Sequence, residues 1–533
     1  MALIIKNPIL SGFSPDPSIC RAGDDFYLVT STFAYFPGLP IYHSKDLTRW
    51  NQIGNAIDRP GQLCFDGHQI SEGLFAPTIR ENSGTFYILC TLIKNGGNFI
   101  LTAKDPKGPW SDPVWLKKAG GIDPSIFFDD DGKVWYCGTD SPPEGEAYSG
   151  NKEIYIHEID LSLLAEGKVN FLGESKGIWQ GALHHVIWPE APHIYKINGW
   201  YYLLHAEGGT SLDHAVCVAR AKNIQGPWEG KKSNPVLTHR FLGRNAGIIN
   251  VGHADLVDDT EGNWRMVLLA SRPFQGVCPL GRETFLIPVI WEDGWPLAAT
   301  ESGMVERQIT INKERQISNK RFFENCCDRF EGRLPLHWLV LRMPVNGKDA
   351  AFSLSERKGA LRLFTRKADM RGRDHPAFAG RRLRHEDWAF SAYIEFAPNA
   401  ENETAGLILL QSEDYQYRFE LCSDSGNLSL RLVRAAGKED EIIIKNNLQI
   451  TENKENLKGV VLGVFCEEMK LSFFYGKDQY SLVCMTDNID ARILSTEYAG
   501  GFVGTLVGVF ASGNGKDIDN YADVLWAEYR GLE

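Results

Sequence analysis

The sequence lacks a long uninterrupted run of apolar residues. No segment of its 533 residues approaches the ~18 consecutive apolar residues that a membrane-spanning helix needs. The first ten residues, MALIIKNPIL, contain one Lys before a Pro but neither a basic n-region nor a long apolar stretch, so they do not have the pattern of a secretory signal peptide. We therefore expect a cytoplasmic chain without a membrane partner, and removal of a native leader stays open.

Several sequence motifs with known chemistry are also missing. There is no Gly-rich phosphate loop followed by Lys, no HExxH and no GxSxG, which argues against phosphoryl transfer, zinc-dependent hydrolysis and serine esterase chemistry. The eleven Cys residues include no CxxC pair, so neither a zinc site nor a disulfide framework is indicated, and we expect mostly reduced core cysteines. The DDDGK run at Asp129 lacks the spacing of an EF-hand and predicts a hairpin turn. No organic cofactor is expected.

An excess of basic charge is missing too. The formal net charge is -12, without long acidic or basic runs, which gives no electrostatic reason to expect a nucleic acid or an anionic membrane as partner. A neutral substrate is expected instead. The length exceeds the ~250 to 300 residues at which one core stops growing, so two or more domains are predicted.

Five similar segments recur within the first three hundred residues. Each begins with a small or acidic residue, four continue as Pro-x-Ile, and all carry a polar turn with Gly before an alternating aromatic run. Each pattern predicts a β-hairpin, with Pro at a strand start where a missing hydrogen-bond donor is tolerated. The segments are DPSICRAGDDFYLVT from Asp16, APTIRENSGTFYILC from Ala76, DPSIFFDDDGKVWYCG from Asp123, APHIYKINGWYYLLH from Ala191 and ADLVDDTEGNWRMVLL from Ala254.

The spacing of these segments predicts the architecture. Their starts are 60, 47, 68 and 63 residues apart, which leaves room for a four-stranded sheet in each unit. Five such sheets arranged radially make a five-bladed β-propeller over residues 1–310. A polar stretch without an apolar face predicts a linker at 311–327. From 328 to 533, alternating runs separated by Gly, Asn or Asp turns predict a β-sandwich, so the fold class is all-β.

Equivalent positions of propeller repeats converge on the central channel, because the innermost strand of each blade runs along it. The residues at these positions are Asp16, Phe75 with Ala76, Asp123, Glu190 and His253. Crowding three carboxylates in a sheltered volume raises their pKa values and costs folding free energy, so function is the better reason for it. Hydrolysis of a glycosidic bond needs two carboxyl groups with separate tasks, one protonated and one ionised.

The chain resembles the family 43 glycoside hydrolases, in particular the two-domain β-xylosidases and α-L-arabinofuranosidases. The resemblance implies an exo-acting inverting hydrolase that releases β-D-xylose and α-L-arabinofuranose from short oligosaccharides, with a concanavalin-like jelly roll as second domain. The segments that carry it are NPILSGFSPDPSICRAGDDFYLVTSTF, HSKDLTRW, FAPTI, GNFILTAKDPKGPWSDP, GIDPSIF, PEAPHIYK, AEGGTS, GHADLV and GRETFLIPVIWEDGWP.

Catalytic roles follow from the same resemblance. Asp16 matches the family's general base, Glu190 its general acid, and Asp123 the third carboxylate, which tunes and orients the acid. Inversion implies that Asp16 activates water, with acid and base separated by about 6.5 to 9.5 Å.

The resemblance also assigns binding residues. His253 corresponds to a channel histidine that often coordinates calcium or its water, although calcium normally prefers oxygen ligands. Arg282 is similar to the arginine that binds the sugar near the acid, and Phe33 to an apolar wall residue. Phe75 stands where many xylosidases of the group carry Trp. Phe502, on a loop of the second domain, is expected to close the pocket.

Two other readings stay open. One is an enzyme that is mainly an α-L-arabinofuranosidase, because Phe75 cannot settle the preference between the two sugars. The other is a propeller that binds carbohydrate or protein without catalysis, which the presence of Asp16, Asp123 and Glu190 disfavours. Self-association of the chain is also left open.

Overall fold

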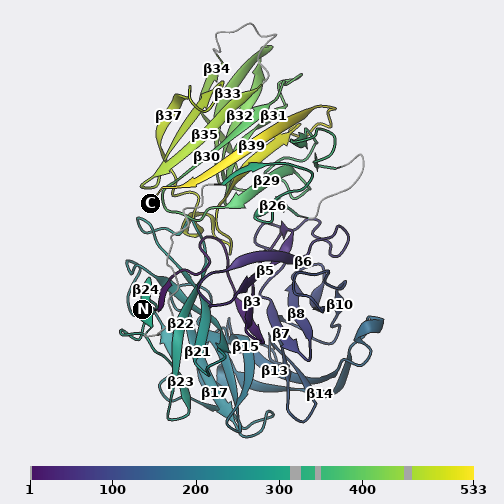
Figure 1. Cartoon of the computed structure of the whole chain (residues 1–533), viewed down its shortest axis with the longest axis vertical. Helices are drawn as coiled ribbons and strands as arrows, with labels where there is room; N and C mark the ends of the chain where they lie inside the picture. Colours follow the sequence, from purple (N-terminus) through teal and green to yellow (C-terminus); the bar gives the residue numbers. More distant parts are fainter. Residues whose placement is uncertain (1–2, 312–325, 343–349, 449–458, 533) are drawn as a thin grey trace.

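The computed structural model describes residues 3–311, 326–342, 350–448 and 459–532. These residues form a β-propeller and a β-sandwich that lie one above the other (Figure 1). The described helices are short: α1 (Gly181–His184), α2 (Thr496–Ala499) and a 3-10 turn at Leu164–Glu166. Among the described residues, no helix has the length and hydropathy to cross a membrane.

Five antiparallel sheets build the propeller in chain order. The first contains β2 (Ser18–Ala22), β3 (Asp25–Val29), β5 (Gly38–Ser44) and β6 (Asn51–Ile57). The second contains β7 (Thr78–Asn82), β8 (Thr85–Leu92), β9 (Gly97–Ala103) and β10 (Val114–Trp115). The third contains β11 (Ile122–Phe128), β12 (Val134–Asp140), β13 (Glu153–Asp160) and β14 (Asn170–Gln180). The fourth contains β15 (Glu190–Ile197), β16 (Trp200–Glu207), β17 (Ala215–Ala221) and β18 (Glu229–Gly230), and β19 (Leu237–Thr238) also pairs with β17. The fifth contains β20 (Ile249–Asp258), β21 (Trp264–Ser271), β22 (Glu283–Glu292) and β23 (Trp295–Ala298).

The five hairpins predicted from the sequence are the first two strands of these five sheets. Each turn between them holds a Gly with positive φ, a conformation that residues with a Cβ adopt only at a cost. The glycines and their φ values are Gly23 (61°), Gly84 (73°), Gly132 (86°), Gly199 (73°) and Gly262 (79°). The DDDGK run at Asp129 is the turn between β11 and β12, as predicted. The five-bladed propeller is therefore confirmed.

The ends of the propeller meet in a small extra sheet. β1 (Leu3–Lys6) pairs with β24 (Gln308–Ile311), so the start and the end of the first domain are tied together. Residues 312–325 of the predicted linker lie outside the described residues. Cys326 and Cys327, at the end of that linker by sequence, lie in β25 (Cys326–Arg329), which pairs with β39 (Tyr521–Gly531) of the sandwich.

Two eight-stranded sheets form the sandwich, as predicted. The first contains β25 with β27 (Phe352–Ser353), β28 (Leu361–Phe364), β30 (Trp388–Glu395), β35 (Val460–Glu467), β36 (Lys470–Gly476), β37 (Val483–Asp490) and β39 (Tyr521–Gly531). The second contains β26 (Trp338–Leu341), β29 (Ala377–Arg382), β31 (Thr404–Leu410), β32 (Tyr415–Asp424), β33 (Asn427–Ala436), β34 (Asp440–Asn447), β38 (Leu506–Ser512) and β4 (Tyr35–Phe36).

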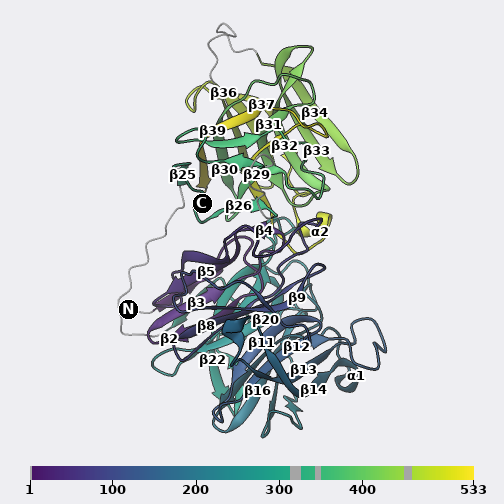
Figure 2. The ribbon, with the colours of Figure 1, turned by 90° about the vertical axis from the view of Figure 1, so that its right-hand side faces the viewer.

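One strand of the second sandwich sheet comes from the propeller. β4 belongs to the loop between β3 and β5, and it pairs with β26 through Tyr35 and Leu341. A shared apolar core joins the two domains at this point, with Phe33 and Tyr35 from the propeller packed among Leu339, Leu341 and Val503. Figure 2 shows the close junction of the two domains at β4. The sandwich is thus joined to the propeller by a shared sheet and a shared apolar core.

A buried arginine strengthens this junction. Arg342 has no exposed surface, and its Nε donates to the carbonyl of His68 at 2.8 Å. Its Nη2 donates to Glu413 of the sandwich at 2.8 Å, and the same carboxylate accepts the backbone N–H of Ile70 at 2.9 Å. A single guanidinium therefore ties a propeller loop to the sandwich.

Candidate active site

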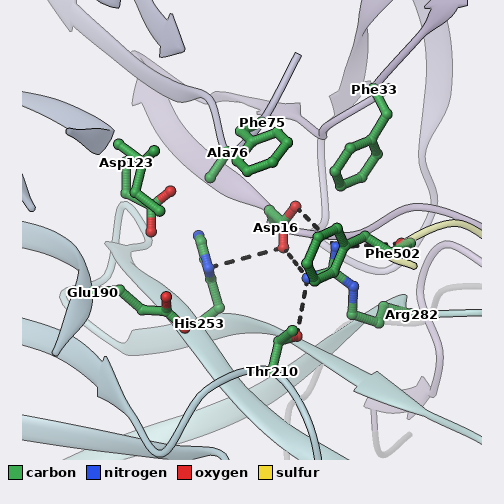
Figure 3. Close-up of a pocket in the computed structure, with 11 residues that line it drawn as sticks. Asp16, Phe33, Phe75, Ala76, Asp123, Glu190, Thr210, His253, Arg282 and Phe502 are labelled. Atoms are coloured by element: carbon green, nitrogen blue, oxygen red, sulfur yellow. Dashed lines mark hydrogen bonds and ion pairs between the residues drawn. The ribbon is translucent and has the colours of Figure 1, made fainter. Parts of the chain in front are cut away.

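A small cavity of about 90 Å³ opens at the end of the propeller that faces the sandwich. All eight site residues predicted from the sequence line it, together with Ala76, Ile122 and Thr210 (Figure 3). The predicted residues are Asp16, Phe33, Phe75, Asp123, Glu190, His253, Arg282 and Phe502. The cavity is far smaller than the ~300 Å³ or more of sites for drug-sized ligands, so it suits one small unit of a ligand.

The topology explains why these residues meet. Asp16, Asp123 and Glu190 stand at or just before the start of an innermost strand, whereas Thr210 and Arg282 lie between the second and third strands of their blades. These two kinds of loop fall at the same end of every blade because neighbouring strands are antiparallel.

The backbone around the cavity is unusual. Left-handed conformations, which cost free energy in residues with a Cβ, occur at five positions in or next to the site. The residues and their φ values are Asp16 (54°), Phe33 (50°), Asp123 (54°), Ala191 (51°) and His253 (48°). None of these residues is Gly or Asn, so no sequence signal marks them. Such strain is typical of functional sites, where the surrounding structure holds it.

Asp16 is held by two strong donors. Arg282 Nη1 donates to Asp16 Oδ1 at 2.7 Å, and the Ser31 hydroxyl donates to Oδ2 at 2.5 Å. The imidazole Nδ1 of His253 lies 3.8 Å from Oδ1. Arg282 therefore pairs with the predicted base, and its charge also opposes the rise in the pKa of Glu190, which agrees with the position near the acid that the resemblance implies. The reason for the pairing is topological, because the loop after β21 ends beside the start of the first blade, where Ser14 N–H donates to the Arg282 carbonyl at 3.0 Å.

Asp123 and Glu190 form a pair of carboxyl groups on the side of the cavity away from Arg282 (Figure 3). Asp123 Oδ2 accepts the backbone N–H of Ala191, the residue after Glu190, at 3.0 Å. Burial, with the nearby charges of Asp123 and Asp16, raises the pKa of Glu190 to about 8. Burial also raises the pKa of Asp123, and the charge of Asp16 adds to that shift while His253 opposes it. Glu190 is therefore protonated at neutral pH and can donate a proton.

Three phenylalanine rings make the apolar wall. Phe33 and Phe502 stack with centroids 5.9 Å apart and planes 15° apart, and Phe75 meets Phe33 edge-on at 5.4 Å. The Arg282 guanidinium lies 5.8 Å from the Phe33 ring centre and 5.5 Å from that of Phe502. This wall, opposite the polar groups, offers an apolar surface to the flat face of a small ring.

Phe502 reaches the cavity from the sandwich. Two hydrogen bonds to the propeller fix its backbone. The Phe502 N–H donates to the Ser71 hydroxyl at 3.0 Å, and the Phe502 carbonyl accepts a bond from Arg282 Nη2 at 3.3 Å. Two glycines permit this approach. A Cβ on Gly281 would lie 2.8 Å from the Gly504 Cα, and one on Gly504 would lie 2.4 Å from the Leu280 carbonyl oxygen. The predicted closing role of this loop is therefore sterically possible only with small residues here.

The surroundings of His253 do not suit a calcium ion well. Calcium takes six to eight oxygen ligands. The carboxylate that faces His253 is that of Asp16, whose oxygens already accept bonds from Arg282 and Ser31. Among the described residues, two groups have metal-ligand spacing, and neither contains His253: His205 with Glu207 and Cys217, and Cys326 with Asp328 and His337.

The guanidinium of Arg80 lies between the inner strands of the propeller. Arg80 of β7 donates from Nη1 to Asp255 Oδ2 at 2.8 Å and from Nη2 to Asp255 Oδ1 at 3.0 Å. Its Nη2 also donates to His193 Nδ1 at 3.0 Å. Burial lowers the pKa of His193 to about 3, so this imidazole is neutral and can accept the bond. Arg80 thus links inner strands of the second, fourth and fifth blades.

Sequence reasoning missed two residues of the site. Thr210 accepts Arg282 Nη1 at 3.0 Å, and Ser31 binds Asp16. Both lie within segments that carry the family resemblance, AEGGTS and STF. The repeat alone could not find them, because they stand in loops between the second and third strands rather than at the repeat starts.

Comparison with known proteins bears on the whole chain. Residues 5–296 match the family "Glycosyl hydrolases family 43", and residues 327–530 match "Beta xylosidase C-terminal Concanavalin A-like domain". A xylosidase/arabinosidase from Butyrivibrio fibrisolvens is 44% identical over 538 residues, which cover 98% of each chain. The non-reducing end alpha-L-arabinofuranosidase BoGH43B from Bacteroides ovatus is 37% identical over 99% of this chain and 95% of its own.

Solved structures agree with these sequence matches. The crystal structure of xylan beta-1,4-xylosidase from Bacillus halodurans superposes with a TM-score of 0.88 at 30% identity, covering 99% of this chain and 100% of the other. Both domains and their arrangement are therefore shared with that structure. The chain belongs to glycosyl hydrolases family 43 and is a glycoside hydrolase.

Proposed function

We propose that this enzyme is an exo-acting, inverting glycoside hydrolase that releases β-D-xylose, and also α-L-arabinofuranose, from the non-reducing ends of xylo- and arabinoxylo-oligosaccharides. The observation that carries the proposal is the division of the carboxyl groups within one small cavity. Asp16 is paired with a guanidinium, whereas Glu190 is kept protonated by burial and by neighbouring carboxylates. Two carboxyl groups in such different surroundings can supply the acid and the base of glycoside hydrolysis.

Glu190 is the general acid of this proposal. With a pKa of about 8 it holds its proton at neutral pH and transfers it to the glycosidic oxygen as the bond to the anomeric carbon breaks. Asp123 acts through Glu190. Its charge favours the protonated acid, and its bond to the Ala191 N–H fixes the backbone that carries the acid.

Asp16 is the general base. The Ser31 hydroxyl and Arg282 fix the two carboxylate oxygens, so that Asp16 takes a proton from a water that attacks the anomeric carbon on the face opposite the leaving group. Net hydrolysis adds the elements of water across one glycosidic bond and inverts the anomeric configuration. Both carboxyl groups then return to their first protonation state by exchange with solvent.

The size and wall of the cavity favour exo action. A cavity of about 90 Å³, closed by Phe502 of the sandwich and by Phe33, admits one terminal sugar. The rest of the oligosaccharide must leave through the mouth, so one sugar is released in each event. Thr210 and Arg282 are placed to bind hydroxyl groups of that sugar.

A mainly α-L-arabinofuranosidase activity is the second candidate. One relative at 37% identity carries that name, and another at 44% is named for both activities. Phe75 is a smaller platform than the Trp found in many xylosidases of the group, which gives a reason for a broader choice of sugar.

The test compares kcat/KM on 4-nitrophenyl β-D-xylopyranoside and 4-nitrophenyl α-L-arabinofuranoside, with xylobiose as the natural substrate. We expect the xyloside to be at least as good a substrate and xylobiose to be cleaved. An arabinofuranoside preference of tenfold, about 1.4 kcal/mol of transition-state stabilisation, with xylobiose intact would support the second candidate. Glu190→Ala should lose most activity on xylobiose, and equally low rates for wild type and variant would contradict catalysis altogether.

A further inference from the structure

Two exposed aromatic side chains of the third and fourth blades lie at the same end of the propeller as the cavity. Tyr148 is 37% exposed and Trp188 is 38% exposed. Tyr148 lies in the loop between β12 and β13, and Trp188 in the segment that leads into β15. These are the two kinds of loop that line the cavity elsewhere, so both residues stand at its end of the propeller.

Trp188 is held in one position. Its backbone has φ of 52°, which is costly for a bulky residue, and its N–H donates to the Gly150 carbonyl at 2.7 Å. The indole lies against two glycines. A Cβ on Gly150 would come within 2.9 Å of the ring, and one on Gly209 within 3.3 Å. The Tyr148 hydroxyl donates to the Val186 carbonyl at 2.6 Å, which ties its loop to the same segment.

A strained, half-exposed tryptophan is poorly explained by folding alone. Burial does not require it, because more than a third of its surface faces solvent. Backbone strain that persists at such a position points to a binding role, for which a rigid aromatic face loses little entropy on contact.

The position of Trp188 matches the leaving-group side of the bond. Only Pro189 separates it from Glu190, so their Cα atoms are at most about 7 Å apart. Gly209, which touches the indole, precedes Thr210 of the cavity wall. The general acid must lie next to the glycosidic oxygen, so the sugar beyond that oxygen extends past Glu190.

The opposite side of the mouth is closed. Phe502 and Phe33 form a stacked wall where the sandwich joins the first blade. In Figure 2, α1, which opens the segment leading to Trp188, lies at the edge of the propeller away from the sandwich. An oligosaccharide with its terminal sugar in the cavity therefore has its free path over the third and fourth blades.

We propose that Trp188, supported by Tyr148, is the platform for the first sugar on the leaving-group side, and that it selects a pyranose ring with an apolar face, as in β-linked xylo-oligosaccharides. This inference rests on the proposed function of the cavity. Stacking of the ring's C–H face on the indole strengthens binding only when the leaving group is a sugar. A substrate without such a ring gains nothing from Trp188.

The experiment compares kcat/KM of Trp188→Ala and wild type on xylobiose and on β-D-xylopyranosyl fluoride, whose leaving group is fluoride. We expect a loss of about tenfold on xylobiose and a change of less than about twofold on the fluoride. Trp188→Phe, which keeps an aromatic face, should recover most of the activity on xylobiose. If Trp188→Ala folds poorly, Trp188→Leu takes its place, because Leu keeps apolar bulk without an aromatic ring. Trp188→Leu should then show the same selective loss on xylobiose.

Leu183→Ala is the matched control, because Leu183 is 73% exposed in the same segment and should change neither rate. Equal losses on both substrates would overturn the platform, since they would mean that Trp188 only positions Glu190. Unchanged rates on both would overturn it as well. A wild-type enzyme that cleaves both substrates, with no selective loss on xylobiose in Trp188→Ala, would contradict the platform alone. A wild-type enzyme that leaves xylobiose intact would overturn the proposed function and the platform with it.

Discussion

Three carboxyl groups share one cavity, and each has different contacts. Asp16 faces Arg282 and Ser31, whereas Glu190 has Asp123 beside it and no cation in direct contact among the interactions described. The separation of roles therefore comes from one arginine placed on one side of the cavity. Crowding of carboxyl groups does not stabilise the fold, so its free-energy cost is explained by the needs of an active site.

The pH profile tests the coupling between Asp123 and Glu190. Glu190 must be protonated to act, so kcat/KM of the wild type should fall as pH rises through about 8. The charge of Asp123 raises the pKa of Glu190, so Asp123→Asn should move this alkaline limb to lower pH while lowering the maximum rate. Steady-state kinetics on xylobiose between pH 5 and 9 measures both effects, on the order of one pH unit for the shift.

An unmoved alkaline limb in Asp123→Asn would contradict this coupling. The Asn side chain keeps an oxygen that can accept the Ala191 N–H, so loss of that backbone contact is not the expected cause of any shift. A shift of the limb to higher pH would also contradict the account, because it would require Asp123 to stabilise the ionised form of Glu190.

At the scale of elements, the loop between α2 and β38 connects the sandwich to the catalytic cavity. Phe502 stands on this loop, and close contacts of Gly281 with Gly504 bring it against the loop that carries Arg282. A change in the sandwich can therefore reach the cavity through a single loop.

Removal of the Phe502 ring should open the cavity. We expect Phe502→Ala to raise KM for xylobiose by about fivefold, because a stacked aromatic ring contributes about 1 kcal/mol and its loss lets water into the cavity. Tyr498→Ala is the matched control, since Tyr498 is 47% exposed on α2 and does not line the cavity. Equal KM values for Phe502→Ala and wild type would show that the ring does not contact the sugar.

The junction of β4 with β26 is the second link between domains, and Arg342 is its buried anchor. Arg342→Met should lower the free energy of unfolding by about 3 to 5 kcal/mol, because the hydrogen bonds of the buried guanidinium are lost and the partly buried Glu413 loses its cation. Thermal unfolding with Arg333→Ala as an exposed control measures the effect. A melting temperature like that of the control would contradict the anchoring role.

How far the sequence predicts this structure depends on the kind of element. The five hairpins followed from the Pro-x-Ile starts and the turn glycines, because backbone chemistry fixes both locally. The strand β4 did not, since two residues of a propeller loop carry no signal that they pair with a strand some three hundred residues later. The same limit applies to Ser31 and Thr210, whose roles depend on loops brought together by the closed ring of blades.

The partner of Arg282 illustrates the limit within the site itself. Resemblance placed this arginine near the acid, where its charge acts on the pKa of Glu190, but it did not show that the guanidinium binds Asp16 directly at 2.7 Å. Which of several carboxylates an arginine contacts depends on the order of the blades and on side-chain direction. Neither is written in the local sequence.

At the scale of the whole molecule, a buried ion pair and its hydrogen bonds join the inner strands of the propeller. Arg80 bridges Asp255 and His193, so inner strands of three blades converge on one guanidinium. We propose that this fixed cation makes a channel calcium ion unnecessary for activity. Chelation with EGTA should leave kcat/KM on xylobiose unchanged within about twofold, and added calcium should not raise it. A loss that calcium reverses would contradict this proposal.

In the proposed mechanism, Asp16 and Glu190 lie on opposite sides of one terminal sugar, and the sandwich closes the cavity behind it. The most direct measurement is proton NMR of the first xylose released from a β-linked xylo-oligosaccharide, recorded before mutarotation. The account predicts α-xylose, since water activated by Asp16 attacks opposite the leaving group. Initial release of β-xylose would contradict it, because retention needs a nucleophilic carboxylate and a closer pair of groups.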